Sequence, residues 1–522
     1  MKKLLFILSV SVLLYACSGT PERGNYIPKS AKAVVTINMK GIVNEIKWDI
    51  LFGGDLFKFE KVGKDAFVKQ LMEDPTKTGV EFMERTYVFV DSSAVDAKPV
   101  IVAIVPLNDA DAFAEFLTMK GDTVVGEGDF QAANSLKATL VWNSKTAFYI
   151  SGQKDLKQAV AYVSNLIDNE KSGLLSTEFK GKSILMGEDH IAFWMNSGDI
   201  QKNLMGQTIY PPLSSVQKPI PSGSTEKSEF TGVVNFKNGK MSISCDQFFD
   251  EKSNLLKVFQ KQSKLKDLAI AADMNKTMLS IGLTANIKAL AAYMGEVGVK
   301  DLADMLLAST GLNTDALATM LDGDVFVSFD GIQIKMEEKE TLEMNEESGE
   351  YEMGTEIAPS YYPTVVAGVS LADTLMMKQV VNRMLYNFAA INKEGVYSFG
   401  PGKGFLFFKD KYMFYVSDSA AVGAIMSGKA LAANDVLNDF STGIVINVKD
   451  ITKKLPLAEI SPDAEIIAKK IEASIEGIKA INKPIKGNTV HAEFELNAVN
   501  KEENILITIL KLMKELDATP EA

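Results

Sequence analysis

Lys32-Ala-Val-Val-Thr-Ile-Asn-Met39, near the start of the chain, has a counterpart in Lys276-Thr-Met-Leu-Ser-Ile-Gly-Leu283. In both stretches apolar and polar residues alternate, which is the pattern of a β-strand with one buried face. Both run directly into a segment whose apolar residues recur at helical spacing. The same strand-then-helix unit therefore occurs twice, and this repetition determines the fold that the sequence predicts.

Four further segments recur in the same order in the two halves, with offsets that drift from one pair to the next. Five matches in order are hard to produce without duplication, and their period is far longer than that of a solenoid repeat. We therefore expect a duplicated domain. The further pairs are Val88–Val90 with Val325–Val327, Pro99–Asp109 with Pro363–Asp373, Lys145–Ser151 with Lys411–Ser417, and Asn196–Leu204 with Asn447–Leu455.

The order of elements within each copy predicts the fold class. Each copy closes with an alternating strand and then an apolar helix, and Asn238-Gly239 predicts a tight hairpin turn in the first copy. Strands interleaved with single helices predict an α+β fold: two tandem copies of a module with a mostly antiparallel sheet and helices on one face. The chain of 522 residues is also too long for a single core. We expect the modules at residues 31–266 and 267–522.

The N-terminus has the pattern of an export signal. Two lysines precede an apolar stretch from Leu4 to Tyr15, too short to span a bilayer. Leu14-Tyr15-Ala16-Cys17 resembles a lipobox, which predicts a lipoprotein signal peptide at 1–16 and lipidation of Cys17; the alternative is an ordinary signal peptide that happens to contain a cysteine. Residues 17–30 lack apolar periodicity and are expected to form a flexible tether.

The residues after Cys17 indicate where the protein is located, and its charge indicates which classes of partner are disfavoured. Ser18 after the modified cysteine resembles the outer-membrane sorting pattern of Gram-negative lipoproteins, and the lone acid Glu22 favours the periplasmic face over the cell surface. The net charge of −12 argues against nucleic acid as a partner. Three arginines, Arg23, Arg85 and Arg383, supply little bidentate recognition of phosphate.

Two insertions distinguish the copies. The first copy has a proline-rich loop from Tyr210 to Ser224, where the second has a stretch, Asp463–Ala480, that is expected to be an amphipathic helix. The second copy also expands the connection after Val327, with nine glutamates between Glu337 and Glu356. Because few apolar residues accompany them, this segment is expected to be a solvated or disordered loop.

No pattern in the sequence predicts catalysis, a cofactor or a metal ion. The sequence shows no partners for His190 or His491 at positions that a catalytic triad or a metal site would need. Cys245 shares a strand face with Met241 and Ile243 and is expected to be a core thiol. The remaining candidates have structural interpretations: Asp109 and Asp111 as a helix cap, Asp322-Gly323-Asp324 as a turn, and Gly400-Pro401-Gly402-Lys403-Gly404 as a hairpin turn without phosphate-loop spacing. We assign no catalytic, cofactor or metal residues.

The lipobox, the opening Ile27–Val35 and Leu321–Val327 together resemble a family of uncharacterised lipoproteins of similar length from Bacteroides-group bacteria. The resemblance covers nearly the whole chain and rests on layout more than on any single motif. It implies a location in the cell envelope and carries no catalytic residues.

Two functional hypotheses follow. The first is a lipid-anchored envelope protein without enzymatic activity, which binds or scaffolds an envelope protein or a small ligand. The second is an envelope hydrolase that uses only carboxylates, for which two buried carboxylates facing one cleft would be the signature. The sequence favours the first hypothesis.

Overall fold

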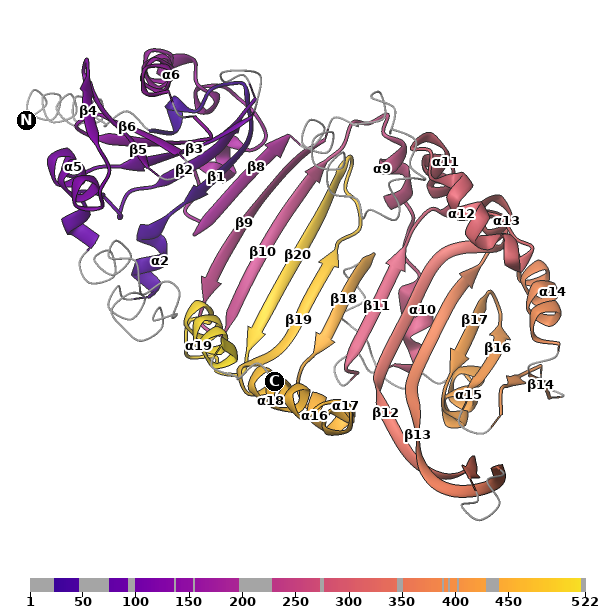
Figure 1. Cartoon of the computed structure of the whole chain (residues 1–522). Helices are drawn as coiled ribbons and strands as arrows, with labels where there is room; N and C mark the ends of the chain where they lie inside the picture. The colour runs from indigo at the N-terminus through magenta and orange to yellow at the C-terminus, as the bar shows by residue number, and fades with distance from the viewer. Residues whose placement is uncertain are drawn as a thin grey trace, which may run out of the picture. The chain divides into compact units, whose positions relative to one another are not determined.

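The computed structural model describes residues 23–46, 75–92, 99–135, 138–153, 155–196, 228–272, 277–344, 351–386, 389–392, 395–400, 403–428 and 441–517. The predicted signal peptide, Cys17 and the proline-rich loop lie outside these residues. The described chain combines helices and antiparallel strands (Figure 1), which confirms the mixed α and β class predicted from the sequence. It forms two compact units: unit 1 contains residues 1–200 and 229–235, and unit 2 contains residues 201–228 and 236–522.

Unit 1 contains an antiparallel sheet whose strands are not in chain order. Every neighbouring pair among the described strands is antiparallel. From one edge the order is β4 (Val124–Glu127), β5 (Phe130–Ser135), β6 (Ala138–Trp142), β7 (Thr146–Ser151), β3 (Val100–Pro106), β2 (Thr86–Asp91), β1 (Ala31–Ile37), β8 (Ile191–Asn196) and the first part of β9 (Glu229–Lys237).

Unit 2 contains a second antiparallel succession of strands. Its order is β14 (Ala390–Ile391), β15 (Tyr397–Ser398), β16 (Phe405–Lys409), β17 (Tyr412–Val416), β13 (Tyr351–Leu371), β12 (Leu321–Met344), β11 (Leu279–Thr284), β18 (Thr442–Asn447), β19 (Ile475–Asn482), β20 (Thr489–Ala498) and β10 (Lys240–Phe248).

The two orders are the same: adding ten to each strand number of unit 1 gives the order of unit 2 from β14 to β19. Side chains also correspond along one line of directly paired residues, which we call the cross-strand row. In unit 1 the row is Phe193, Val35, Val88, Ala103, Tyr149 and Leu140. In unit 2 it is Ile444, Ile281, Val327, Ala367, Tyr415 and Leu406.

Helices pack on both faces of each sheet, contrary to the expected single face. In unit 1, α5 (Ala110–Met119) packs in a cluster with Ala147, whereas α6 (Leu156–Asp168) packs in another with Phe148. Adjacent strand residues point to opposite faces, so these two helices lie on opposite sides. Unit 2 repeats the arrangement with α14 (Thr374–Leu385) beside Met413 and α15 (Ser419–Met426) beside Phe414.

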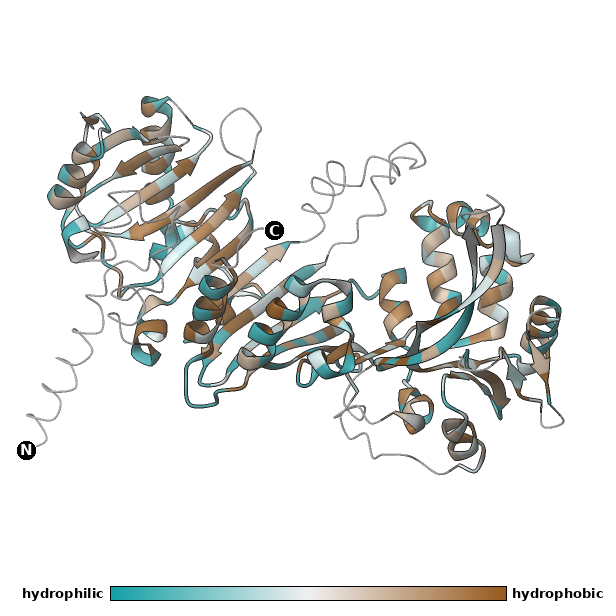
Figure 2. Ribbon diagram, turned by 60° about the horizontal axis from the view of Figure 1, so that its bottom comes forward, coloured by the Kyte–Doolittle hydropathy of each residue, from teal (hydrophilic) through white to brown (hydrophobic). Residues whose placement is uncertain are grey.

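The remaining helices are short, apart from two near the C-terminus. Figure 2 shows apolar and polar segments alternating along the strands that they accompany. The further α-helices are α2 (Met39–Glu45), α7 (Lys182–Leu185), α9 (Asn254–Phe259), α10 (Leu265–Leu268), α11 (Ile287–Glu296), α12 (Lys300–Leu307), α13 (Thr314–Met320), α16 (Ile451–Lys454), α17 (Leu457–Ile460), α18 (Pro462–Ser474) and α19 (Ile505–Asp517).

The flexible tether predicted for residues 17–30 is wrong from Arg23 onward. A 3₁₀ turn, η1 (Arg23–Tyr26), docks on unit 1, where Tyr26 and Ile27 are buried in the core. The Arg23 guanidinium donates to the Thr146 hydroxyl over 3.1 Å and also pairs with Glu84. Two buried apolar side chains were enough to order a segment whose average composition suggested a linker.

Strand pairing overrides local composition in one further prediction and at the end of another. The segment from Glu337 to Glu356 is not a solvated loop: its described residues belong to the long hairpin β12–β13. The helix expected over Asp463–Ala480 stops at Ser474, and Ile475 begins β19 between β18 and β20. By contrast, Gly239 adopts a φ of +66° after Asn238, as the predicted hairpin turn requires.

Candidate functional site

His491 lies on the polar face of β20, as its alternation with apolar neighbours predicted. Its Nδ1 is 2.7 Å from an Asp246 oxygen on the paired strand, and its Nε2 is 3.3 Å from Glu493. Burial alone would raise the pKa of Glu493, but hydrogen bonds from Lys483 and His491 outweigh it and lower that pKa. Among the residues that the structure describes, both imidazole nitrogens therefore face carboxylates of an ion-pair network, and neither faces the nucleophile that a triad requires.

His190 precedes β8 and is buried in unit 1, with a relative exposure of 4%. Its carbonyl accepts from the Asn38 amide over 2.8 Å, its own amide donates to the Asn235 side chain, and its Nε2 lies 3.5 Å from Glu45. These contacts fasten α2 to the end of β8. We therefore assign His190 a structural role.

Cys245 lies on the predicted apolar face of β10 but is half-buried instead of forming part of the core. Burial, together with the neighbouring Asp246 charge, raises the pKa of its thiol to about 11. Because the thiolate is the reactive form, this environment suppresses nucleophilic chemistry at neutral pH.

Asp324 is the most completely buried carboxylate in a cluster at the start of β12. Its two oxygens accept from the Lys261 ammonium at 2.6 Å, the Lys264 amide at 3.1 Å, the Thr284 hydroxyl at 2.8 Å and the Ser370 hydroxyl at 2.9 Å. A carboxylate with four donors has no lone pair left for a substrate. Asp324 fastens the segment that connects the two predicted modules to the sheet of unit 2.

Asp322, two residues before Asp324, also belongs to this cluster and pairs with Lys261 and Lys264. Burial would raise the Asp322 pKa, but the hydrogen bond from Lys264 and the charges of Lys261 and Lys264 lower it. The turn predicted for Asp322-Gly323-Asp324 is wrong: the three residues belong to β12, at a register irregularity where Gly323 has a φ of +108°. Two adjacent carboxylates that are each paired with lysine do not form an acid–base couple.

The remaining motifs have the structural roles that were predicted for them. Asp109 caps α5, accepting from the amides of Asp111 and Ala112. Gly400 and Gly404 flank the connection between the paired strands β15 and β16, as a hairpin requires. Within the described part of the chain, no group of three or more His, Cys, Asp or Glu residues could hold a metal ion.

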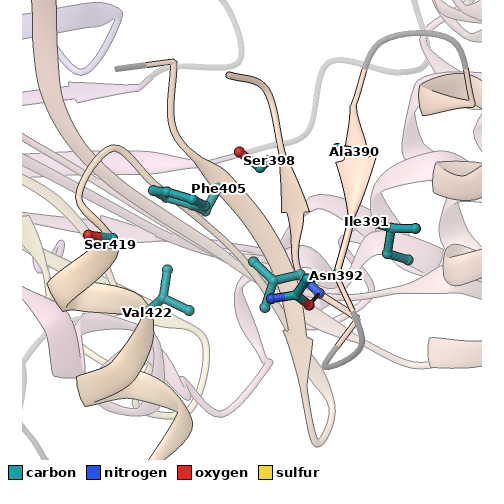
Figure 3. A pocket seen from close by; sticks show the side chains of 8 residues that line it. Ala390, Ile391, Asn392, Ser398, Phe405, Ser419 and Val422 are labelled. Atoms are coloured by element: carbon teal, nitrogen blue, oxygen red, sulfur yellow. Dashed lines mark hydrogen bonds between the residues drawn. The ribbon is translucent and has the colours of Figure 1, made fainter. Parts of the chain in front are cut away.

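A cavity of about 300 Å³ opens beside β14, β15 and α15 in unit 2 (Figure 3). Its lining is apolar apart from Asn392, Ser398 and Ser419, and it includes no carboxylate. Asn392 already accepts from the Val396 amide over 2.9 Å, which closes the turn after β14. The cavity can receive a small apolar group, and its lining has no histidine, carboxylate, lysine or cysteine that could act as a base or activate a serine hydroxyl.

The most unusual surface is the outer part of the β12–β13 hairpin, residues 331–344 and 351–364, which we call the arm. Among the described strands, only β13 neighbours β12 beyond Phe329, and Figure 1 shows the two strands continuing past the others and curling at their far end. Five large apolar side chains on it are more than 40% exposed. They are Ile334 (43%), Met336 (63%), Met353 (65%), Ile357 (68%) and Tyr361 (47%).

The two faces of the arm differ. On one, Glu337 accepts from the Tyr362 hydroxyl over 2.5 Å, and the Lys339 ammonium donates to the Pro359 carbonyl over 2.7 Å. The Lys335 ammonium also lies 5.2 Å from the centre of the Tyr362 ring. This face is satisfied by contacts within the arm.

On the opposite face the Tyr361 hydroxyl donates to Glu459 of α17, and the side chains farther out along the arm have no such contact with the residues that the structure describes. Ile334, Met336, Glu338 and Glu340 follow one another on this face at alternate positions of β12, facing Tyr361, Pro359, Ile357 and Thr355 of β13. Glu338 and Glu340 are exposed and form no hydrogen bond or ion pair with the residues that the structure describes. This face therefore carries an apolar stretch near the sheet, two carboxylates without a described partner farther out, and the exposed Met353 beyond them.

The arm also concentrates the charge of the protein. Its residues, 331–344 and 351–364, contain six glutamates and two lysines, a net charge of −4, which is a third of the −12 of the whole chain. The sequence revealed these glutamates but not the strand pairing that aligns them with exposed apolar side chains. The alternation of Ile332, Ile334 and Met336 was the available signal.

Comparisons with known proteins add little. No protein-family model matches the sequence, and no curated protein is similar to it. A solved structure described as crystal form I of TP0453 is 13% identical, with a match covering 45% of this chain and 80% of that one at a TM-score of 0.25. A putative DNA polymerase III beta subunit from Eubacterium rectale is 8% identical, with 74% and 98% covered and a TM-score of 0.09. Likenesses this weak carry no argument.

No helix among the described residues is long and apolar enough to cross a membrane.

Proposed function

We propose that this chain is a lipoprotein of the outer membrane, anchored through Cys17 and facing the periplasm, that acts by binding or scaffolding and not by turnover. One observation carries the binding part of the proposal: the arm exposes five large apolar side chains on a surface that the sheet does not need. Exposed apolar surface that is gathered in one place, and not scattered singly, marks an interaction site.

The physical cost of the arm supports this interpretation. A two-stranded ribbon is at best marginally stable in water, because neither face is covered and both edges are unpaired. Unit 2 nevertheless extends β12 and β13 well beyond their pairing with β11 and β17. Binding of a partner to the exposed face would offset that cost.

We further propose that residues 31–266 and 267–522 are tandem copies of one module. The support is the identical strand order, together with a cross-strand row that places Ala103 and Tyr149 where Ala367 and Tyr415 stand in the second copy. Hydrogen bonds correspond as well: the Leu107 amide donates to the Lys145 carbonyl, and the Leu371 amide to the Lys411 carbonyl, both over 2.8 Å. On this proposal the arm is an addition to a shared scaffold.

Site-specific photo-crosslinking in intact cells tests the binding function. A photoreactive residue replacing Met336 should yield a discrete crosslinked product, because that position is in the exposed apolar face. The matched control replaces Met305 of α12, which is 61% exposed but outside the arm. Equal crosslinking at both positions, or none at position 336, would contradict the proposal.

Anchoring has its own test. Cys17→Ala should abolish labelling by radioactive palmitate and move the protein from the detergent phase to the aqueous phase, because the thiol is where the acyl chains would attach. Ser18→Ala is the matched control and should leave both properties intact. Wild-type labelling of the Cys17→Ala variant would overturn the lipoprotein assignment.

A further inference from the structure

We infer that the arm binds a cationic, amphipathic segment of another polypeptide. This inference rests on the proposed binding function and specifies the chemistry of the partner. A segment that fits carries large apolar side chains at one end and lysine or arginine at the other.

The sequence of side chains along the open face sets this pattern. Ile334, Met336, Glu338 and Glu340 occupy alternate positions of one strand, so neighbours among them are spaced about 7 Å apart. The apolar part is widened by Tyr361, Pro359 and Ile357 on the paired strand. An extended segment lying along this face would meet apolar surface first and carboxylates about two residues later.

The carboxylates of Glu338 and Glu340 favour a positively charged partner. Covering the apolar surface also removes water from Glu338 and Glu340, and desolvation of a carboxylate without a partner is strongly unfavourable. Glu337 on the other face has the Tyr362 hydroxyl as a partner, whereas these two glutamates form no such bond. A lysine or arginine from the partner would supply the missing donor and turn a penalty into an attraction.

The same charges disfavour two other occupants. Pairing the arms of two copies would bring two surfaces of net charge −4 together, and like charges placed opposite each other destabilise strand pairing. An anionic lipid surface would be repelled for the same reason. A basic polypeptide uses both the apolar and the acidic part of the face.

Binding of synthetic peptides to the full mature chain in a neutral detergent tests the inference. One labelled peptide alternates lysine with threonine in one half and leucine with threonine in the other; a matched peptide has glutamate in place of lysine. Fluorescence anisotropy should show at least tenfold tighter binding of the lysine peptide. Its affinity should fall as salt is raised from 50 to about 500 mM, because added salt screens charge pairs.

Variants then locate the site. Met336→Ser combined with Ile357→Ser should weaken binding of the lysine peptide tenfold or more, whereas Met305→Ser with Leu306→Ser, also exposed, should change it less than twofold. Glu338→Gln with Glu340→Gln should weaken binding and flatten its salt dependence. The control for charge is Glu251→Gln with Glu502→Gln, two exposed glutamates outside the arm.

Several outcomes would overturn the inference. They are equal binding of the two peptides, an arm-dependent dimer in sedimentation, and arm-dependent binding to vesicles of phosphatidylcholine and phosphatidylglycerol. If crosslinking at position 336 succeeds in cells but the lysine peptide has no advantage, the binding function stands and the cationic partner is wrong. If both experiments fail, the proposed function fails with it.

Discussion

Two hairpins occupy the same place in the two units and differ mainly in length. Strands β2 and β3 of unit 1 share five directly opposed residue pairs, from Tyr87–Ile104 to Asp91–Val100. Strands β12 and β13 of unit 2 share five comparable pairs, from Val325–Val369 to Phe329–Val365, and then continue as the arm. Each hairpin has the equivalent strand on either side, β1 and β7 or β11 and β17.

The difference separates what the fold requires from what was added to it. The inner pairs bury Phe89 and Phe326 almost completely, at 1% and 0% exposure. The outer part of the second hairpin leaves Met336 and Ile357 more than 60% exposed. Unit 1 forms its sheet with a hairpin that has no such extension, so folding does not demand the arm. The predictions below test this division.

The largest effects are expected in the shared core. Phe148 and Phe414 occupy equivalent positions on β7 and β17, with 0% and 1% exposure, and their strands stand beside β3 and β13. Phe148→Ala and Phe414→Ala should each cost about 4 kcal/mol of unfolding free energy, because each leaves a large cavity. Urea denaturation measures this, and a cost below about 1 kcal/mol in one unit would break the equivalence of the two scaffolds.

A somewhat smaller effect is expected at the buried aspartates of the two hairpins. Asp324→Ala should cost about 3 kcal/mol, because it deprives the nearly buried Lys261 ammonium of its closest partner. Asp91→Ala should cost about 2 kcal/mol, because Asp91 accepts from the neutral Ser30 and Tyr162 hydroxyls. The control is Asp322→Ala, at a more exposed carboxylate, which should cost less than about 1 kcal/mol.

Urea denaturation also measures these costs. The reverse ranking of Asp324→Ala and Asp91→Ala would mean that Lys261 finds another partner, and the anchoring role assigned to Asp324 would be wrong.

The smallest effect on the unfolding free energy is expected from removal of the arm, although this is the largest change to the chain. Replacing residues 333–362 with Asn-Gly keeps the Ile332–Pro363 pair and should change the unfolding free energy by less than about 1 kcal/mol, since the arm contributes little buried surface. Thermal and urea unfolding should stay cooperative, and the lysine-peptide affinity should fall to background. A loss above about 3 kcal/mol would show that the arm belongs to the scaffold.

The sequence predicted the repeated part of the fold more successfully than the added part. Pro99–Asp109 and Pro363–Asp373 each predicted a strand followed by a helix, and both copies contain them, because apolar periodicity is a local signal. The face of the sheet covered by each helix was not predictable in this way. It depends on which of two adjacent residues, such as Ala147 and Phe148, meets a helix from elsewhere in the chain.

The arm was misjudged because its pairing is long-range. Nine glutamates between Glu337 and Glu356 suggest solvation when the segment is considered alone. The register that sets Met336 opposite Pro359, and Glu338 opposite Ile357, emerges only when the two strands are aligned. The sequence therefore predicted the acidic charge of the arm but not the surface on which that charge lies beside exposed apolar side chains.

Hydrogen exchange over the two hairpins is the most direct test of the claim that the arm is an addition to a complete scaffold. Amides of Tyr87–Asp91 and Val325–Phe329 should exchange only through global unfolding, which for a stable domain costs about 5–15 kcal/mol. Amides of 333–342 and 353–362 should exchange at least a hundredfold faster in the free protein and slow down when the lysine peptide is bound. Arm amides that are as protected as those of the inner pairs, with or without peptide, would contradict the account.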